Sequence, residues 1–195
     1  RKPEYVYQIE KERAGSYQIE VLAKSKEHEV PITLRFQELR DEQMQPAHGE
    51  LPFFLQENTV IQFLQYPYEQ VVAENFVEIL EKMELINDLS CYEEIYGILK
   101  KEALDGRKVE QQIIEIGTKR ELFFGKDRLD TVLHYKDYTY MKRKWTAYLK
   151  RERKKDPDWV EVMTLLEAFF PPVWRAIIRD EIFIGDWMPE LCRFL

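Results

Sequence analysis

The sequence predicts an α+β chain, with a small strand-rich part over residues 1–66 followed by a helical domain over residues 67–195. Residues 4–36 alternate apolar and polar side chains with the period of two that a half-buried strand requires. From Tyr68 onward, apolar residues recur at the spacing of an amphipathic helix. The length of 195 residues is sufficient for a sizeable core. Runs of strands followed by runs of helices are typical of the α+β class.

Four strands are expected in the N-terminal part. The alternating stretches predict strands over residues 5–9, 17–22 and 30–36, and a last one over 59–64, with a turn at Ala14-Gly15. Pro31 places the third strand at an edge or at a strand start, because proline cannot donate to a ladder. Residues 40–52 are polar and contain two prolines and a glycine, so they predict a loop.

Five helices are expected after Tyr68. The apolar stripes predict helices over residues 68–85, 89–103, 108–123, 138–154 and 158–170. Asp156-Pro157 supplies an N-cap and a first-turn proline for the last helix, and Pro171-Pro172-Val173 suggests its end. The tail, residues 180–195, is expected to pack irregularly.

Charge and cysteine content limit the class of protein. The net charge of −7 argues against general nucleic-acid coating. Residues 68–105 hold ten acidic and three basic side chains, whereas residues 142–155 hold eight basic and one acidic. Two cysteines make no disulfide framework, which favours a cytoplasmic protein. No apolar run is long enough to span a bilayer and no signal peptide is visible. The first residue is Arg1, so the chain is expected to be a fragment or a processed product.

Residues 66–96 carry a motif-like pattern. An extended segment leads into Ala73-Glu74-Asn75, a helix with Lys82 follows, and then the run from Ser90 to Tyr96. This order resembles the AbiEii-like nucleotidyltransferases, toxins of bacterial abortive-infection systems, in which Ala-Glu-Lys precedes an Arg and then Arg-Asp-x-x-Asp-x-Tyr. The resemblance covers roughly residues 55–190 and includes the later Lys-Arg-Lys-Trp run. Lysine, arginine and the first aspartate of the family pattern are replaced here by Asn75, Ser90 and Cys91.

The resemblance implies transfer of a nucleotide, with magnesium, to an RNA or protein acceptor. It assigns a catalytic role to Glu20 and Glu94, and nucleotide binding to Glu74, Asn75, Lys82 and Tyr96. Losing charged contacts typically costs several kcal/mol of transition-state stabilisation, so little activity is expected from this chain alone. No metal site is predicted; magnesium and a nucleoside triphosphate are expected only if missing N-terminal motifs are supplied. On the residues alone, Glu20 is equally the outward residue of an alternating strand, and Tyr96 fits the core.

One internal match to the nucleotide-binding motif exists. Gly15-Ser16 is followed by Glu27-His28-Glu29, which mimics the Gly-Ser and acidic-pair spacing of this superfamily. The intervening residues alternate as a strand, so a hairpin turn and a loop are favoured over a phosphate-binding helix start.

The most basic stretch is a candidate partner-binding surface. It comprises Lys142, Arg143, Lys144, Trp145, Lys150, Arg151 and Arg153. Interleaved cations and aromatics suit RNA, whereas a helix with its aromatics inside and its cations in water is the alternative. A second function is therefore a non-catalytic interaction module that binds an antitoxin, another protein, or a second copy of itself, and no membrane. An upstream Gly-Ser with two nearby acids would favour the enzyme, and a native start close to Arg1 would favour the module.

Overall fold

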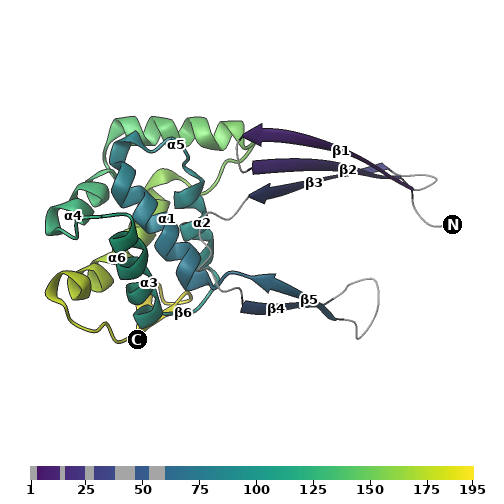
Figure 1. Cartoon of the computed structure of the whole chain (residues 1–195). Coiled ribbons are helices and arrows are strands. Elements are labelled where there is room, and N and C mark those ends of the chain that lie inside the picture. Colours follow the sequence, from purple (N-terminus) through teal and green to yellow (C-terminus); the bar gives the residue numbers. More distant parts are fainter. Residues whose placement is uncertain (1–3, 14–15, 25–28, 38–46, 53–59) are drawn as a thin grey trace. The chain divides into compact units, whose positions relative to one another are not determined.

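The computed structural model describes residues 4–13, 16–24, 29–37, 47–52 and 60–195 (Figure 1). The chain divides into two compact units, residues 1–45 and residues 46–195, and each is described by itself. The boundary between the units follows residue 45, whereas the sequence suggested a boundary after residue 66. The two differ because the strand hairpin of residues 47–65 belongs to the second unit. The mixed strand and helix content confirms the α+β class. The described helices include none long and apolar enough to cross a membrane.

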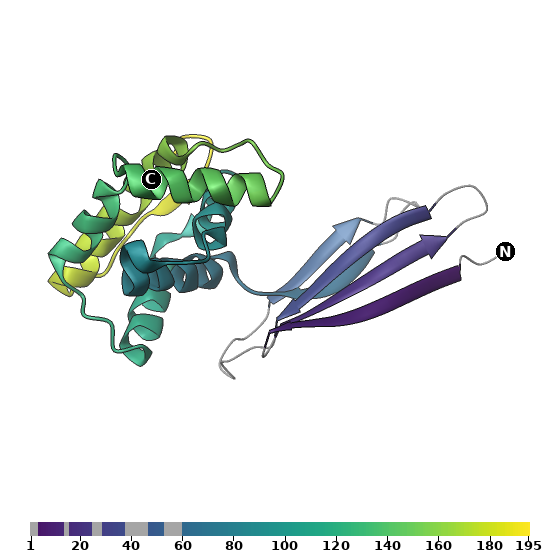
Figure 2. The same cartoon turned by 90° about the horizontal axis from the view of Figure 1, so that it is seen from above.

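The first unit contains a three-stranded antiparallel meander, β1 (Glu4–Arg13), β2 (Ser16–Lys24) and β3 (Glu29–Gln37). All three strands predicted for this part are present and longer than expected. Figure 2 shows them side by side. Pro31 lies on β3, which among the described strands pairs only with β2. This edge position suits proline, because proline has no backbone N–H to donate to a second neighbouring strand. Ser16 begins β2 and pairs with Arg13, which agrees with the favoured hairpin interpretation rather than with a phosphate-binding helix start; Gly15 itself lies outside the described residues. Glu27 and His28 lie outside the described residues.

The second unit begins with an antiparallel hairpin. Its strands are β4 (Ala47–Pro52) and β5 (Val60–Gln65), with Ala47 opposite Gln65. The predicted loop over 40–52 is therefore wrong for residues 47–52, where pairing with β5 overrides the turn-forming composition. Residues 40–46 lie outside the described range.

Helices make up most of the second unit (Figure 1). They are α1 (Tyr68–Lys82), the short 3₁₀ helix η1 (Met83–Leu85), α2 (Ser90–Leu99), α3 (Gly106–Lys119), α4 (Lys126–His134), α5 (Thr139–Arg151) and α6 (Trp159–Arg179). The five predicted helices are confirmed with shifted ends, and α4 was not predicted. Helix α1 packs on α2 and α3, whereas α6 contacts α2, α3, α4 and α5.

The start and end of α6 differ from the prediction. The N-cap is Asp158, whose carboxylate accepts a hydrogen bond from the Glu161 amide at 2.8 Å, rather than Asp156. The helix continues through Pro171-Pro172 to Arg179. Apolar side chains on both sides of the prolines are buried, and this packing offsets the local cost of proline.

The C-terminal tail forms part of a small sheet rather than an irregular cap. Strand β6 (Leu104–Asp105) pairs with β7 (Asp186–Met188), which pairs with β8 (Arg193–Phe194). Trp187 on β7 is fully buried and donates its indole N–H to the Leu99 carbonyl at 2.8 Å. The predicted irregular tail is therefore wrong for residues 186–188 and 193–194, because Trp187 anchors β7 against the end of α2.

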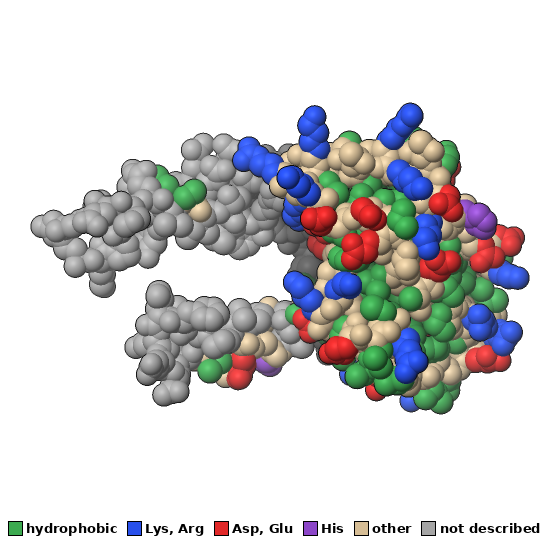
Figure 3. Space-filling view, turned by 180° about the vertical axis from the view of Figure 1, so that it is seen from behind, with side chains coloured by type: hydrophobic (Ala, Val, Ile, Leu, Met, Phe, Trp, Pro, Cys, Tyr) green, Lys and Arg blue, Asp and Glu red, His purple; other side chains and the backbone are tan. Residues whose placement is uncertain are grey.

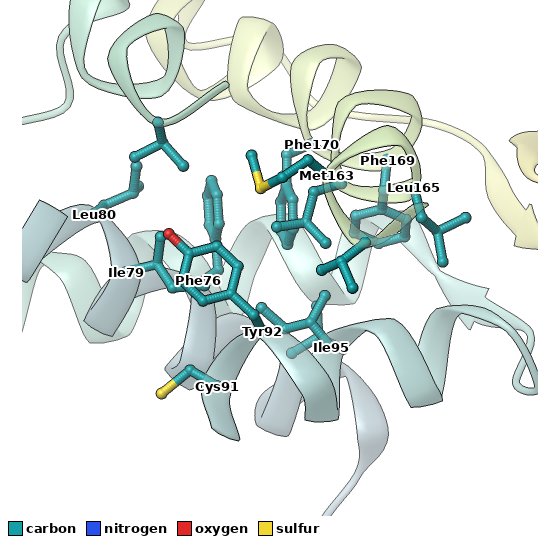
Figure 4. Close-up of a cluster of buried hydrophobic side chains, with 14 of the residues drawn as sticks. Phe76, Ile79, Leu80, Cys91, Tyr92, Ile95, Met163, Leu165, Phe169 and Phe170 are labelled. Atoms are coloured by element: carbon teal, nitrogen blue, oxygen red, sulfur yellow. The ribbon is translucent and has the colours of Figure 1, made fainter. Parts of the chain in front are cut away.

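The core of the second unit lies between α1, α2 and α6 (Figure 4). Phe76 on α1 stacks on Phe170 of α6, with ring centroids 3.6 Å apart and an interplanar angle of 4°. Tyr92 on α2 meets Trp159 of α6 edge to face at 5.0 Å. These three helices therefore pack together, and α1 and α2 carry the candidate residues Glu74, Asn75, Lys82, Glu94 and Tyr96.

Candidate functional site

Asn75 and Glu94 are brought together across the α1–α2 pair. The Asn75 Nδ2 atom donates to the Glu94 Oε2 atom at 2.8 Å, and both side chains are at the surface. The two residues are 19 positions apart in the sequence. The resemblance assigns nucleotide binding to Asn75 and a catalytic role to Glu94, and these two side chains touch, although the asparagine is neutral where the family has a lysine.

Glu74 and Lys82 belong to a separate group of charges, which centres on Arg120 at the end of α3 and on Glu78. The Arg120 guanidinium lies 3.7 Å from the Glu74 carboxylate and 3.1 Å from that of Glu78. It also lies 3.6 Å from the carboxylate of Glu81. Lys82 pairs with Glu78 one helical turn away. These charges form an ion-pair network that joins α1 to α3 and does not include Glu94.

Tyr96 lies at the boundary between α2 and α6. Its hydroxyl donates a hydrogen bond to the Glu161 carboxylate, and the Lys100 ammonium lies 3.9 Å from the same carboxylate. Burial first, and then this hydrogen bond, raise the pKa of Tyr96. The half-buried ring packs against the core, so the structural interpretation of Tyr96 accounts for its contacts.

The described residues do not fit the ligand set of a two-metal nucleotidyltransferase site. Glu94 accepts from Asn75, Glu74 faces Arg120, and no described group of three or more His, Cys, Asp or Glu could hold a metal ion. Glu20 lies on β2 of the other unit, where its backbone is opposite Gln8 and Thr33. These residues alone do not assemble the metal site that the resemblance implies.

Several cations of the basic stretch are tied to other elements. The Lys144 ammonium donates to the Glu84 carbonyl at 3.1 Å and also to the Ile86 carbonyl, so it closes the 3₁₀ turn after α1. Lys142 lies 3.6 Å from the highly exposed carboxylate of Asp137. Lys144 and Lys142, which the sequence pattern assigned to partner binding, therefore already interact with groups of the chain itself.

Glu93 links α2 to the end of α5. Its carboxylate accepts from the Tyr148 hydroxyl at 2.5 Å and from the Lys154 ammonium at 2.5 Å. Burial first, and then the hydrogen bond to Glu93, raise the pKa of Tyr148. Glu93 was not selected from the sequence, because nothing local indicates a partner 55 residues away.

The remaining cations are exposed. Arg143, Lys150 and Arg153 have no ion pair with the described part of the chain, and Arg151 pairs only with its neighbour Glu152 at 3.0 Å. Figure 3 shows Lys and Arg side chains projecting from the edge that α5 forms in Figure 1. Exposed α5 cations are therefore available for an external anion.

A hollow of about 570 Å³ lies between α5, the loop after it and the start of α6, and we call it the basic hollow. Four lysines line it: Lys142, Lys150, Lys154 and Lys155. Its other lining residues are Trp145, Thr146, Leu149, Asp158, Trp159 and Val160. Lys154 and Lys155 were not selected as sites from the sequence, although the basic run extends to them.

Trp145 serves the core rather than the surface. Only 1% of the residue is exposed, and its indole N–H donates to the Pro157 carbonyl at 2.9 Å. Trp159 is 4% exposed and donates to the Tyr135 carbonyl at 2.8 Å. The predicted role of Trp145 in base stacking is not available in this conformation, because its ring is covered.

Cys91 is expected to resist alkylation in the native protein. Burial first, and then nearby carboxylates led by Asp88, raise its pKa to about 12, and the thiolate is the reactive form. In a Cys192→Ser variant, a thiol reagent at pH 8 should modify almost no protein until urea unfolds the chain. The Cys91→Ser/Cys192→Ser variant supplies the blank, and rapid modification without urea would contradict the burial.

Comparisons with protein-family models, with curated proteins and with solved structures gave no match for this chain.

Proposed function

We propose that this chain is the helical part, or a degenerate version, of an AbiEii-like nucleotidyltransferase that does not transfer nucleotides by itself. The contact between Asn75 and Glu94 supports this proposal most directly, since it joins α1 and α2 at two positions of the family pattern. The family's lysine would place a positive charge at that contact, where the chain has a neutral amide. On this proposal the helix pair keeps the family arrangement without its phosphate-binding charge.

The proposal includes a place of action and a partner. Both cysteines are free, which suits the reducing cytoplasm of a bacterium or archaeon. A cognate antitoxin is the partner that the family resemblance implies. A nucleotidyltransferase-like sheet, with Glu20 near the nucleotide, belongs to this proposal too.

Titration calorimetry with Mg·ATP and the other nucleoside triphosphates tests the nucleotide part of the proposal. The unchanged chain should show no micromolar binding, whereas Asn75→Lys should increase nucleotide affinity by about tenfold through one charged phosphate contact. A Gln111→Lys variant, which adds the same charge at an exposed position on α3, is the matched control. Micromolar binding by the unchanged chain would contradict its predicted inactivity, and no gain from Asn75→Lys would remove the support that the Asn75–Glu94 contact provides.

The coding sequence upstream of Arg1 offers a second, independent test. A Gly-Ser turn with two nearby acids there would support the enzyme, whose transfer activity could then be assayed with the longer chain. A start codon close to Arg1 would favour an interaction module instead.

A non-catalytic module that binds an anionic partner is the second candidate function. The basic hollow favours it, because four lysines converge there from α5 and the following loop. Such a cluster attracts anions at long range and weakens with salt. Retention on a heparin column that falls steadily with added salt is the expected result, and passage without retention at low salt would contradict this function.

A further inference from the structure

We infer that the basic hollow is a docking site for an acidic peptide segment that carries one aliphatic side chain. This inference rests on the second function proposed above and names its partner class. It depends on the charge, the apolar contacts and the hydrogen-bonding capacity of the residues that line the hollow.

The charge of the hollow is strongly positive within an acidic protein. Four lysines and one acid, Asp158, line it, whereas the whole chain has a net charge of −7. Lys150 and Lys155 have no ion pair with the described residues, whereas Lys142 pairs with Asp137 and Lys154 pairs with Glu93. A ligand with spaced carboxylates complements these point charges, because each lysine ammonium needs one acceptor and imposes no planar geometry.

The apolar contacts of the hollow suit an aliphatic side chain better than a nucleobase. Val160 is 42% exposed at the start of α6, and the stems of the rim lysines add methylene surface. The two tryptophan rings are almost fully covered and their N–H groups are already bonded. A base could not stack on either ring face without disrupting the core, whereas one aliphatic side chain can rest on Val160 and the lysine stems.

Asp158 favours a peptide over a nucleic-acid strand as the ligand of the basic hollow. Its carboxylate caps α6 by accepting from the Glu161 amide, and the residue is exposed in the lining of the hollow. A peptide backbone offers N–H donors to its remaining acceptor capacity. A phosphodiester backbone offers no donor and repels the carboxylate, so the lining favours a peptide.

Fluorescence anisotropy with three labelled probes tests the inference on the full chain. The probes are a short Glu/Ser peptide with one central Leu, the same peptide with Ser in place of Leu, and a single-stranded oligouridylate of matched charge. The leucine peptide should bind about tenfold more tightly than its serine counterpart, and more tightly than the oligonucleotide.

Two lining variants and one control on the same helix locate the site. Lys150→Glu and Val160→Glu should each weaken binding of the leucine peptide by about tenfold or more. Val160→Glu places an acid in the first turn of α6, where the helix dipole tolerates it. Arg143→Glu changes the same charge on an exposed α5 residue outside the hollow, and should weaken binding by less than about threefold.

Each other outcome overturns a defined part of the proposal. Tighter binding of the oligonucleotide would assign the hollow to nucleic acid. Equal losses from Arg143→Glu and Lys150→Glu would show a general basic face, which leaves the second proposed function intact but removes the docking site. Failure of all three probes to bind at low salt would remove the second proposed function itself, without bearing on the nucleotidyltransferase resemblance.

Discussion

Replacing Phe170 with alanine is expected to destabilise the second unit by about 3–5 kcal/mol, the range for deleting a large aromatic from a core. The side chain is fully buried and stacks on Phe76 with ring centroids 3.6 Å apart. It also meets Phe169 edge to face at 5.0 Å. The loss would include the cavity left between α1 and α6, since neighbouring rings cannot collapse into it without moving a helix. Urea denaturation followed by circular dichroism at 222 nm measures the change.

Phe123→Ala is the matched control for that measurement. Phe123 is 78% exposed, so the same deletion should change the free energy of unfolding by no more than about 0.5 kcal/mol. Similar unfolding midpoints for the two variants would contradict the placement of Phe170 at the centre of the α1–α6 contact.

The predicted helices follow from periodicity, and the errors occur where periodicity is weak or is overridden. Only Leu129 and Val132 are buried on helix α4. Two buried apolar residues are too few to produce a helical periodicity that can be recognised in the sequence. Proline normally costs a helix about 3 kcal/mol. Around Pro171-Pro172 that cost is offset by burial of Phe170 and Val173, and this burial exists only once α6 meets the other helices.

The predicted site residues are dispersed for a related reason. Sequence spacing places Glu74, Asn75 and Lys82 on one helix, but cannot say which neighbour each side chain faces. Arg120 at the end of α3 binds Glu78 of α1, although the two residues are 42 positions apart in the sequence. The Asn75–Glu94 contact lies instead between α1 and α2. Long-range ion partners of this kind carry no local signal, so only the folded structure distinguishes the two groups.

Changing Lys150, Arg151 and Arg153 together to glutamine should leave the melting temperature nearly unchanged and weaken anion binding about tenfold or more. Lys150 and Arg153 have no ion pair with the described residues, whereas Arg151 pairs with its neighbour Glu152 and its guanidinium lies 5.3 Å from the centre of the Tyr148 ring. Exposed pairs contribute at most about 1 kcal/mol each to folding. Binding of an acidic peptide or of oligouridylate should also become less sensitive to salt, because fewer charges are neutralised in the complex.

Loss of stability is expected for the tied cations of the same stretch, of which Lys154 also lines the basic hollow. Lys144 holds the carbonyls of Glu84 and Ile86, and Lys154 holds the Glu93 carboxylate. Changing both to glutamine should therefore lower the free energy of unfolding by about 1–3 kcal/mol, since it weakens hydrogen bonds to charged groups at two helix junctions. Thermal melts and salt-dependent anisotropy on both variants separate the two roles. If the first variant unfolds early while the second does not, the cations assigned to partner binding stabilise the fold instead, and the exposed α5 surface loses its proposed role.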